Sequence, residues 1–172
     1  MKKRAFVVGV GLLLGAISVL GQHRASPQTL EGIERFAVIV EQLEENVRGL
    51  GLDRVELQER VIKKLRDSGV NVVADWQDLE EEGSPVLHIQ INTQPYLRGE
   101  LISYSVRLKF MQGVILSRNL DERILAPTWD FGGVGLAARE DFQFVGDNVI
   151  ILLDSFVSDF TRANGISGAD ED

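Results

Sequence analysis

The chain contains no cysteine among its 172 residues. This absence excludes disulfide bonds, thiolate nucleophiles, cysteine metal sites and a lipid-modified cysteine near the amino terminus. Only two histidines are present, so a histidine cluster that would hold a metal ion cannot be built. The folded part must therefore be held together by its core alone.

Positive charge is concentrated at the amino terminus. Three basic residues at 2–4 precede an uncharged apolar run of 16 residues at 5–20, which is the layout of a bacterial secretory signal. The run is short for a membrane span, which needs about 20 apolar residues. We therefore expect a signal peptide over 1–21 and a periplasmic or secreted protein. An uncleaved membrane anchor and a cytoplasmic protein are the alternatives.

Removal of this signal leaves a strongly acidic chain. The whole chain has a net charge of −8, and losing three cations leaves 15 basic and 26 acidic residues, a net charge of −11. Such a chain repels nucleic acid and anionic lipid. We therefore expect no nucleic-acid partner, and membrane contact only if the amino-terminal segment stays uncleaved.

The remaining residues fit one domain, which is preceded by a linker and followed by a tail. We expect a linker at 22–32, a single α+β domain at 33–166 and a disordered acidic tail at 167–172. About 150 residues can bury roughly 70% of the surface that the unfolded chain exposes. A stable core is therefore feasible without covalent cross-links.

A capped helix is expected directly after Asp53. Leu57, Val61 and Leu65 recur at four-residue spacing, which is typical of an amphipathic helix. The Asp53 carboxylate can accept hydrogen bonds from the first turn, and Gly69 can end the helix.

Strand patterns lie on both sides of this helix, and a second helix closes the chain. Pro127 places the last strand at an edge or a break. The expected strands are 33–43, 70–74, 86–92, 101–110, 114–118 and 122–131, followed by a loop at 131–140 and a helix at 141–163.

The order of these elements predicts the fold class. Only the first connection between strands looks like a helical crossover, and the others look like hairpins. The expected fold is an α+β two-layer sandwich, in which a mixed, mostly antiparallel sheet of five or six strands carries two helices on one face.

The strands at 86–92 and 101–110 alternate strictly between apolar and polar residues. Their apolar sides belong to the core under the helices. Their polar sides form a free face, which is either a binding surface or simply solvated. The residues of this candidate binding face are His88, Gln90, Asn92, Ser103, Ser105, Arg107 and Lys109.

Two weak candidates for catalysis stand on this sheet. His88 lies in the middle of a strand, and Ser103 or Ser105 could lie across from it, as nucleophilic catalysis requires. Asp130 stands beside Trp129, an aromatic residue that we expect to close the core rather than to bind a ligand. A surface histidine and a solvated carboxylate are the simpler interpretations.

A glycine motif at 133–138 resembles a dinucleotide fingerprint, G-x-G-x-x-A. That fingerprint needs a second parallel strand after its helix, which carries an acid for the ribose. The chain ends before such a strand. We therefore expect no nucleotide, no other cofactor and no metal.

The closing helix carries a candidate partner patch. Phe144 and Ile151 are seven residues apart and fall on the polar side of the helix, so they could form a small contact surface. Alternatively, the helix begins after Phe144, which then packs into the core. The opposite, core-facing stripe is Phe142, Val145, Val149, Leu152, Leu153, Phe156 and Phe160.

The stretch RVELQERVIKKLRDSGVNVVAD and the long strands after it resemble small α/β domains of bacterial envelope assembly factors. Examples are the amino-terminal domain of TolB and the lipopolysaccharide-assembly protein LptE, and the resemblance runs over 36–110. It implies docking to envelope partners rather than catalysis. The chain differs from LptE in lacking a lipobox cysteine, and from TolB in lacking propeller repeats.

The sequence therefore favours a non-enzymatic exported binding or assembly module of the envelope, with an envelope protein or a second copy as partner. The rival hypotheses are a small periplasmic hydrolase that uses His88 or Asp130, and a structural subunit that forms a homodimer.

Overall fold

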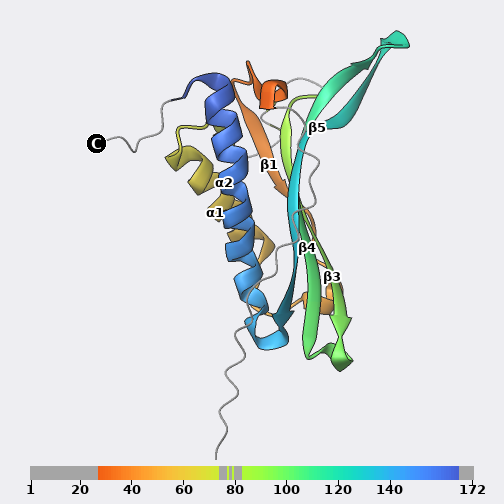
Figure 1. The fold of residues 1–172 in the computed structure, drawn as a ribbon, viewed down its shortest axis with the longest axis vertical. Coiled ribbons are helices and arrows are strands. Elements are labelled where there is room, and N and C mark those ends of the chain that lie inside the picture. Colours follow the sequence, from red (N-terminus) through yellow and green to blue (C-terminus); the bar gives the residue numbers. More distant parts are fainter. Residues whose placement is uncertain (1–26, 74–76, 78, 80–82, 167–172) are drawn as a thin grey trace, which may run out of the picture.

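The computed structural model describes residues 27–73, 77, 79 and 83–166. One sheet forms one layer, and two helices form the other (Figure 1). The expected signal peptide, Trp76 and the acidic tail lie outside the described residues. The elements are η1 (Pro27–Leu30), β1 (Phe36–Val40), η2 (Glu45–Val47), α1 (Arg54–Asp67), β2 (Val72–Val73), β3 (Val86–Tyr96), η4 (Leu97–Gly99), β4 (Leu101–Leu116), β5 (Asn119–Ala138), η5 (Arg139–Phe144) and α2 (Val145–Asn164).

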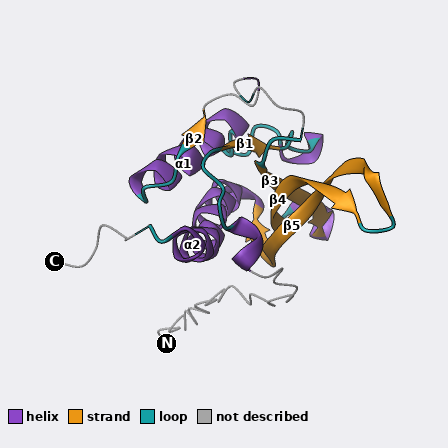
Figure 2. Ribbon diagram, turned by 90° about the horizontal axis from the view of Figure 1, so that it is seen from above, coloured by secondary structure: helices purple, strands orange, loops and turns teal. Residues whose placement is uncertain are grey.

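The sheet is mixed, and its strand order is β2-β1-β3-β4-β5. β1 pairs in parallel with β2 and β3, whereas the pairs β3–β4 and β4–β5 are antiparallel. Both helices lie side by side on one face of the sheet (Figure 2). The predicted α+β two-layer fold is confirmed. One predicted connection is wrong, because the chain from β2 to β3 crosses to the other side of β1 and is not a hairpin.

Helix α1 begins and ends where its sequence predicts. The Asp53 carboxylate accepts hydrogen bonds from the backbone N–H groups of Val55 and Glu56, at 2.8 and 2.9 Å. At the other end Gly69 has a φ of 78°, and the Val70 N–H donates to the Leu65 carbonyl. This is the glycine-ended helix geometry that satisfies the last carbonyls.

The closing helix starts four residues later than expected. Residues Arg139–Phe144 form the 3₁₀ segment η5, and α2 begins at Val145. Phe142 is nevertheless fully buried. Within α2 the predicted stripe faces the sheet, and its only partly exposed member is Leu152.

The core lies between the helices and the sheet, and an aromatic cluster fills one end. The ring of Phe156 contacts Phe36, Phe110, Trp129 and Phe160, with centroid distances of 5.1–5.6 Å. Trp129 is 1% exposed, which confirms it as a core residue. Its indole N–H donates to the buried Asp159 carboxylate at 3.0 Å, so the polar atom of the ring is satisfied.

The folded domain begins before residue 33. Leu30 in η1 is fully buried, and the Thr29 hydroxyl donates to the Thr128 carbonyl of β5 at 2.8 Å. The expected linker at 22–32 therefore contains a core residue, Leu30, near its end.

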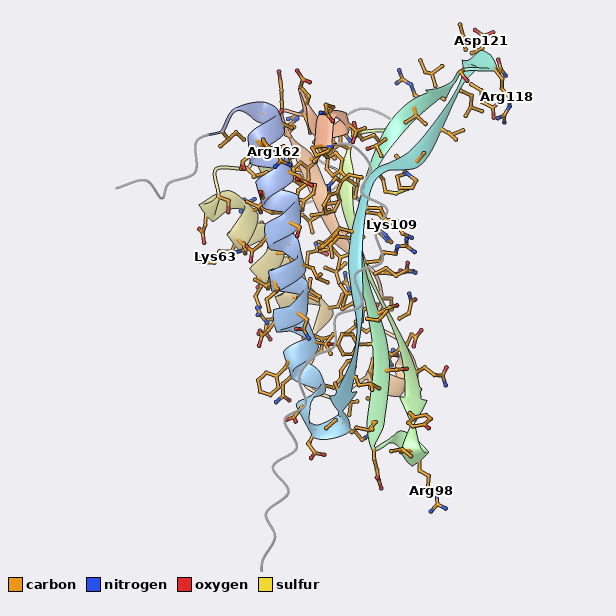
Figure 3. All side chains as sticks on the ribbon, viewed as in Figure 1. Lys63, Arg98, Lys109, Arg118, Asp121 and Arg162 are labelled. Atoms are coloured by element: carbon orange, nitrogen blue, oxygen red, sulfur yellow. The ribbon has the colours of Figure 1, made fainter. Side chains whose placement is uncertain are left out.

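β4 and β5 continue past the core as a two-stranded arm, with Arg118 and Asp121 at its tip (Figure 3). The strand predicted at 114–118 is the end of β4, not a separate strand. The arm begins at a bulge, because the pairing shifts after Phe110↔Trp129 to Met111↔Pro127. Pro127 lies at this bulge in an edge strand, where its missing N–H is tolerated. The position agrees with the edge or break that the sequence predicted.

Candidate functional site

The structure places the seven candidate binding residues on one face of the sheet, as the alternation predicted. The β3–β4 pairs on that face are His88↔Lys109, Gln90↔Arg107, Asn92↔Ser105 and Gln94↔Ser103. Figure 3 shows Lys109 pointing away from α2. The face is therefore the one that the helices leave uncovered.

Much of the hydrogen-bonding capacity of this face is used within the face itself. The Arg107 guanidinium donates to both oxygens of the Asp130 carboxylate, at 3.1 and 3.0 Å. Lys109 Nζ donates to the Gln90 side-chain oxygen at 3.3 Å. These contacts leave the Arg107 end of the face a poor candidate for a ligand site.

The structure does not place a serine beside His88, as the hydrolase hypothesis requires. His88 lies opposite Lys109, and Ser105 is four residues further along β4, or about 13 Å at strand spacing. Ser103 is more distant still. The suggestion that a serine lies across from His88 is therefore wrong, and Asp130 is held by Arg107 in an ion pair.

A groove lies at the other end of the sheet and has a volume of about 900 Å³. Its wall includes side chains from both sides of the sheet, so the groove passes around β5, the last strand. The lining residues are Asn92, Thr93, Gln94, Ser103, Tyr104, Ser105, Val134, Gly135, Leu136, Ala137, Ala138, Asp141, Phe144, Val145 and Asn148.

Glycines in β5 bring the strand close to its neighbours. A Cβ atom on Gly135 would lie 2.5 Å from the Tyr104 hydroxyl, and one on Gly132 would lie 2.3 Å from the Val106 carbonyl. Between and beyond them, Val134 and Leu136 are 50% and 59% exposed. The edge of the sheet therefore presents the apolar side chains of Val134 and Leu136 on one face. On the other face Gly135 packs against the ring of Tyr104.

The lining is nearly free of charge. Among the described lining residues, Asp141 is the only carboxylate, and none is a lysine or arginine. Burial raises the pKa of the Tyr104 hydroxyl, and a hydrogen bond from the Asn148 side-chain amide, at 2.6 Å, partly opposes this rise. The site is suited to binding a largely uncharged group, and it holds no base–nucleophile pair.

We expect the stability of the protein to fall at alkaline pH because of Tyr104. Its folded-state pKa is raised above the ordinary value of about 10, so the folded state holds the phenol proton more tightly than the unfolded chain does. This contribution is fully present below about pH 10 and is lost as the pH rises through the folded-state pKa. Tyr104→Phe should remove this part of the loss in urea unfolding curves recorded between about pH 9 and 11.

Tyr96→Phe is the matched control, since Tyr96 is the other tyrosine of the chain and is 62% exposed. The Tyr96→Phe control should still lose stability at alkaline pH, as the native protein does. Parallel losses in the native protein and in Tyr104→Phe would contradict the prediction.

The predicted partner patch is divided by the structure. Helix α2 does begin after Phe144, as the alternative expected. Phe144 and Ile151 are both exposed, at 55% and 64%, so the expectation that Phe144 packs into the core is wrong. Phe144 lines the groove, whereas Ile151 does not. Three of the seven candidate binding residues, Asn92, Ser103 and Ser105, also line the groove.

Sequence reasoning missed the part of the groove that β5 contributes. Residues 131–138 were expected to form a loop, and the structure shows them as the end of β5. The available signal was the alternation in GVGL, where Val134 and Leu136 alternate with glycines. The glycine motif at 133–138 is thus strand, and not a phosphate-binding turn before a helix.

Among residues 27–73, 77, 79 and 83–166, no group of three acidic or histidine side chains is placed to hold a metal ion. No helix in this described part has the length and apolar character needed to cross a membrane. No protein-family model matches the chain, and the curated proteins contain no significant match to it.

Proposed function

We propose that the protein is an exported, non-enzymatic binding module of the bacterial envelope, which acts by holding a partner in the groove around β5. One observation carries this proposal: an apolar groove of about 900 Å³ lies open at the end strand of the sheet. The secretory layout of residues 1–21 and the resemblance to envelope assembly factors support the exported location.

The groove favours binding over catalysis for a chemical reason. Its polar groups are neutral amides and hydroxyls, apart from Asp141, and such groups orient a ligand without transferring protons efficiently near neutral pH. His88 lies outside the groove lining. Among the described residues, His88 has no serine across from it and Asp130 is paired with Arg107.

Site-specific photocrosslinking tests this function in cells that produce the protein. A photoreactive amino acid in place of Val134 should give a covalent adduct with an envelope protein. The same replacement at Leu120, which is 74% exposed at the far arm, is the control and should not give that adduct. Mass spectrometry of the recovered protein should also find Gln22 at its amino terminus.

Absence of an adduct from Val134 in exported protein would contradict the binding role. Recovery of the protein with Met1 intact, in the cytoplasm, would contradict the exported location. A protein that crosslinks only to itself would favour the homodimer.

A further inference from the structure

We infer that the groove takes an extended peptide segment of a partner protein, which adds to the sheet as a strand beside β5. This inference rests on the proposed function and names the form of its partner. Strand addition is a recurring mode of peptide recognition, in which main-chain hydrogen bonds provide affinity and alternate side chains provide specificity.

The backbone of β5 offers an edge of limited length. Among the described residues, β4 is the only strand that pairs with β5. On one side η1 occupies the edge, because Thr29 donates to the Thr128 carbonyl. At its other end β5 stops at Ala138, and the chain continues as η5 from Arg139, whose N–H donates to the Glu100 carbonyl on the β4 side. Residues 132–138 lie within this stretch, and five of them, 134–138, line the groove.

In this segment alternate residues direct their N–H and C=O groups away from β4. Seven residues span about 23 Å at strand spacing. This length matches an added strand of ordinary size, which is about five or six residues.

The shape of the groove matches a strand rather than a compact ligand. Successive side chains of an added strand point to opposite faces of the sheet. The groove has lining on both faces: Val134 and Leu136 on the uncovered face, and Phe144 and Val145 on the side of α2. An added strand can therefore place apolar side chains in contact with both walls at once.

Charge defines the occupant further. The described lining residues include one carboxylate, Asp141, and no cation, and the whole chain has a net charge of −8. The complementary segment has apolar side chains, no acidic residue and a lysine or arginine that meets Asp141. The same acidic balance disfavours a second copy of this chain as the occupant.

The first experiment pans random nine-residue peptides, displayed on phage, against the purified full chain. Enriched peptides should lack aspartate and glutamate and should carry a lysine or arginine. One enriched peptide is then synthesised with single N-methyl groups along its backbone, and its affinity is measured by fluorescence anisotropy. Because only alternate amides of an added strand face β5, methylation should weaken binding at least tenfold at every second position and little at the positions between.

Matched variants locate the peptide on the protein. Val134→Lys and Leu136→Lys should each weaken binding at least tenfold. Ile115→Lys and Ile151→Lys replace side chains of similar exposure, 54% and 64%, elsewhere on the surface and should leave binding unchanged. Asp141→Asn should weaken the binding of a peptide that contains lysine. It should not weaken the binding of the same peptide with glutamine in place of that lysine.

Several results would overturn strand addition. Binding that tolerates methylation at every position would show a side-chain contact only. A fatty acid such as oleate that binds in the groove, while no peptide is enriched, would identify an acyl ligand. Dimerisation in sedimentation experiments that Val134→Lys abolishes would identify a second copy. If Val134 still crosslinks to an envelope protein in cells, any of these results leaves the proposed function standing while strand addition fails.

Discussion

Replacement of Phe156 by alanine is expected to lower the free energy of unfolding by about 3–5 kcal/mol. The ring is fully buried and contacts four other aromatic rings, which belong to β1, β4, β5 and α2. Its removal leaves a cavity where the helix meets three strands, so neighbouring side chains cannot collapse without moving several elements. Urea unfolding followed by tryptophan fluorescence measures the loss.

Ile151→Ala is the control on the same helix. Ile151 is 64% exposed, so its truncation should change the free energy of unfolding by less than about 0.5 kcal/mol. Equal losses from the two variants would mean that the core-facing side of α2 has been assigned wrongly.

Leu108→Ala is expected to cost about 2–5 kcal/mol. Leu108 is fully buried in the middle of β4, between Ile89 of β3 and Phe131 of β5. The neighbouring change Arg107→Ala should cost less than about 1 kcal/mol, because Arg107 forms an ion pair with Asp130 on the open face, where its side chain is 55% exposed.

These two substitutions are adjacent in the chain and on opposite faces of one strand. Urea unfolding of both variants under the same conditions therefore tests the alternation of β4 directly. Similar losses would contradict the assignment of the two faces.

Local rules were sufficient where each element carries its own signal. Helix α1 has a capping aspartate, apolar residues at four-residue spacing and a terminal glycine, and all three act within the helix itself. The strands at 86–92 and 101–110 have period-two alternation, which fixes the buried face regardless of what covers it. The uncovered polar face was predictable for the same reason.

The groove was not predictable because it depends on which strand ends the sheet. Residues 132–135 have the composition of a loop, and only pairing with β4 makes them strand. The close approach of Tyr104 to Gly135 is a contact between residues far apart in sequence. The crossing from β2 to β3 likewise follows from pairing with β1, which no local pattern reports.

The sequence predicted the sheet face of Asn92, Ser103 and Ser105 correctly, but it did not predict that these three line a groove that Arg107 and Lys109 do not reach. They were grouped with Arg107 and Lys109 because all share one strand face. In the structure the cations are bound within the face by Asp130 and Gln90, at the end away from the groove. The division of the face depends on the partners that β5 brings.

The arm that β4 and β5 form beyond the core has a consequence for the motions of the chain. Its cross-strand pairs, such as Val114↔Ile124, lie in a ribbon of two strands, which is marginally stable in water without further packing. The free energy of local opening should therefore decline along β4 from Leu108 to Leu116. Amide hydrogens in the arm would exchange with solvent, while those of the same two strands beneath α2 stay protected. One continuous β4–β5 ladder would therefore have a fast-exchanging part and a slow-exchanging part.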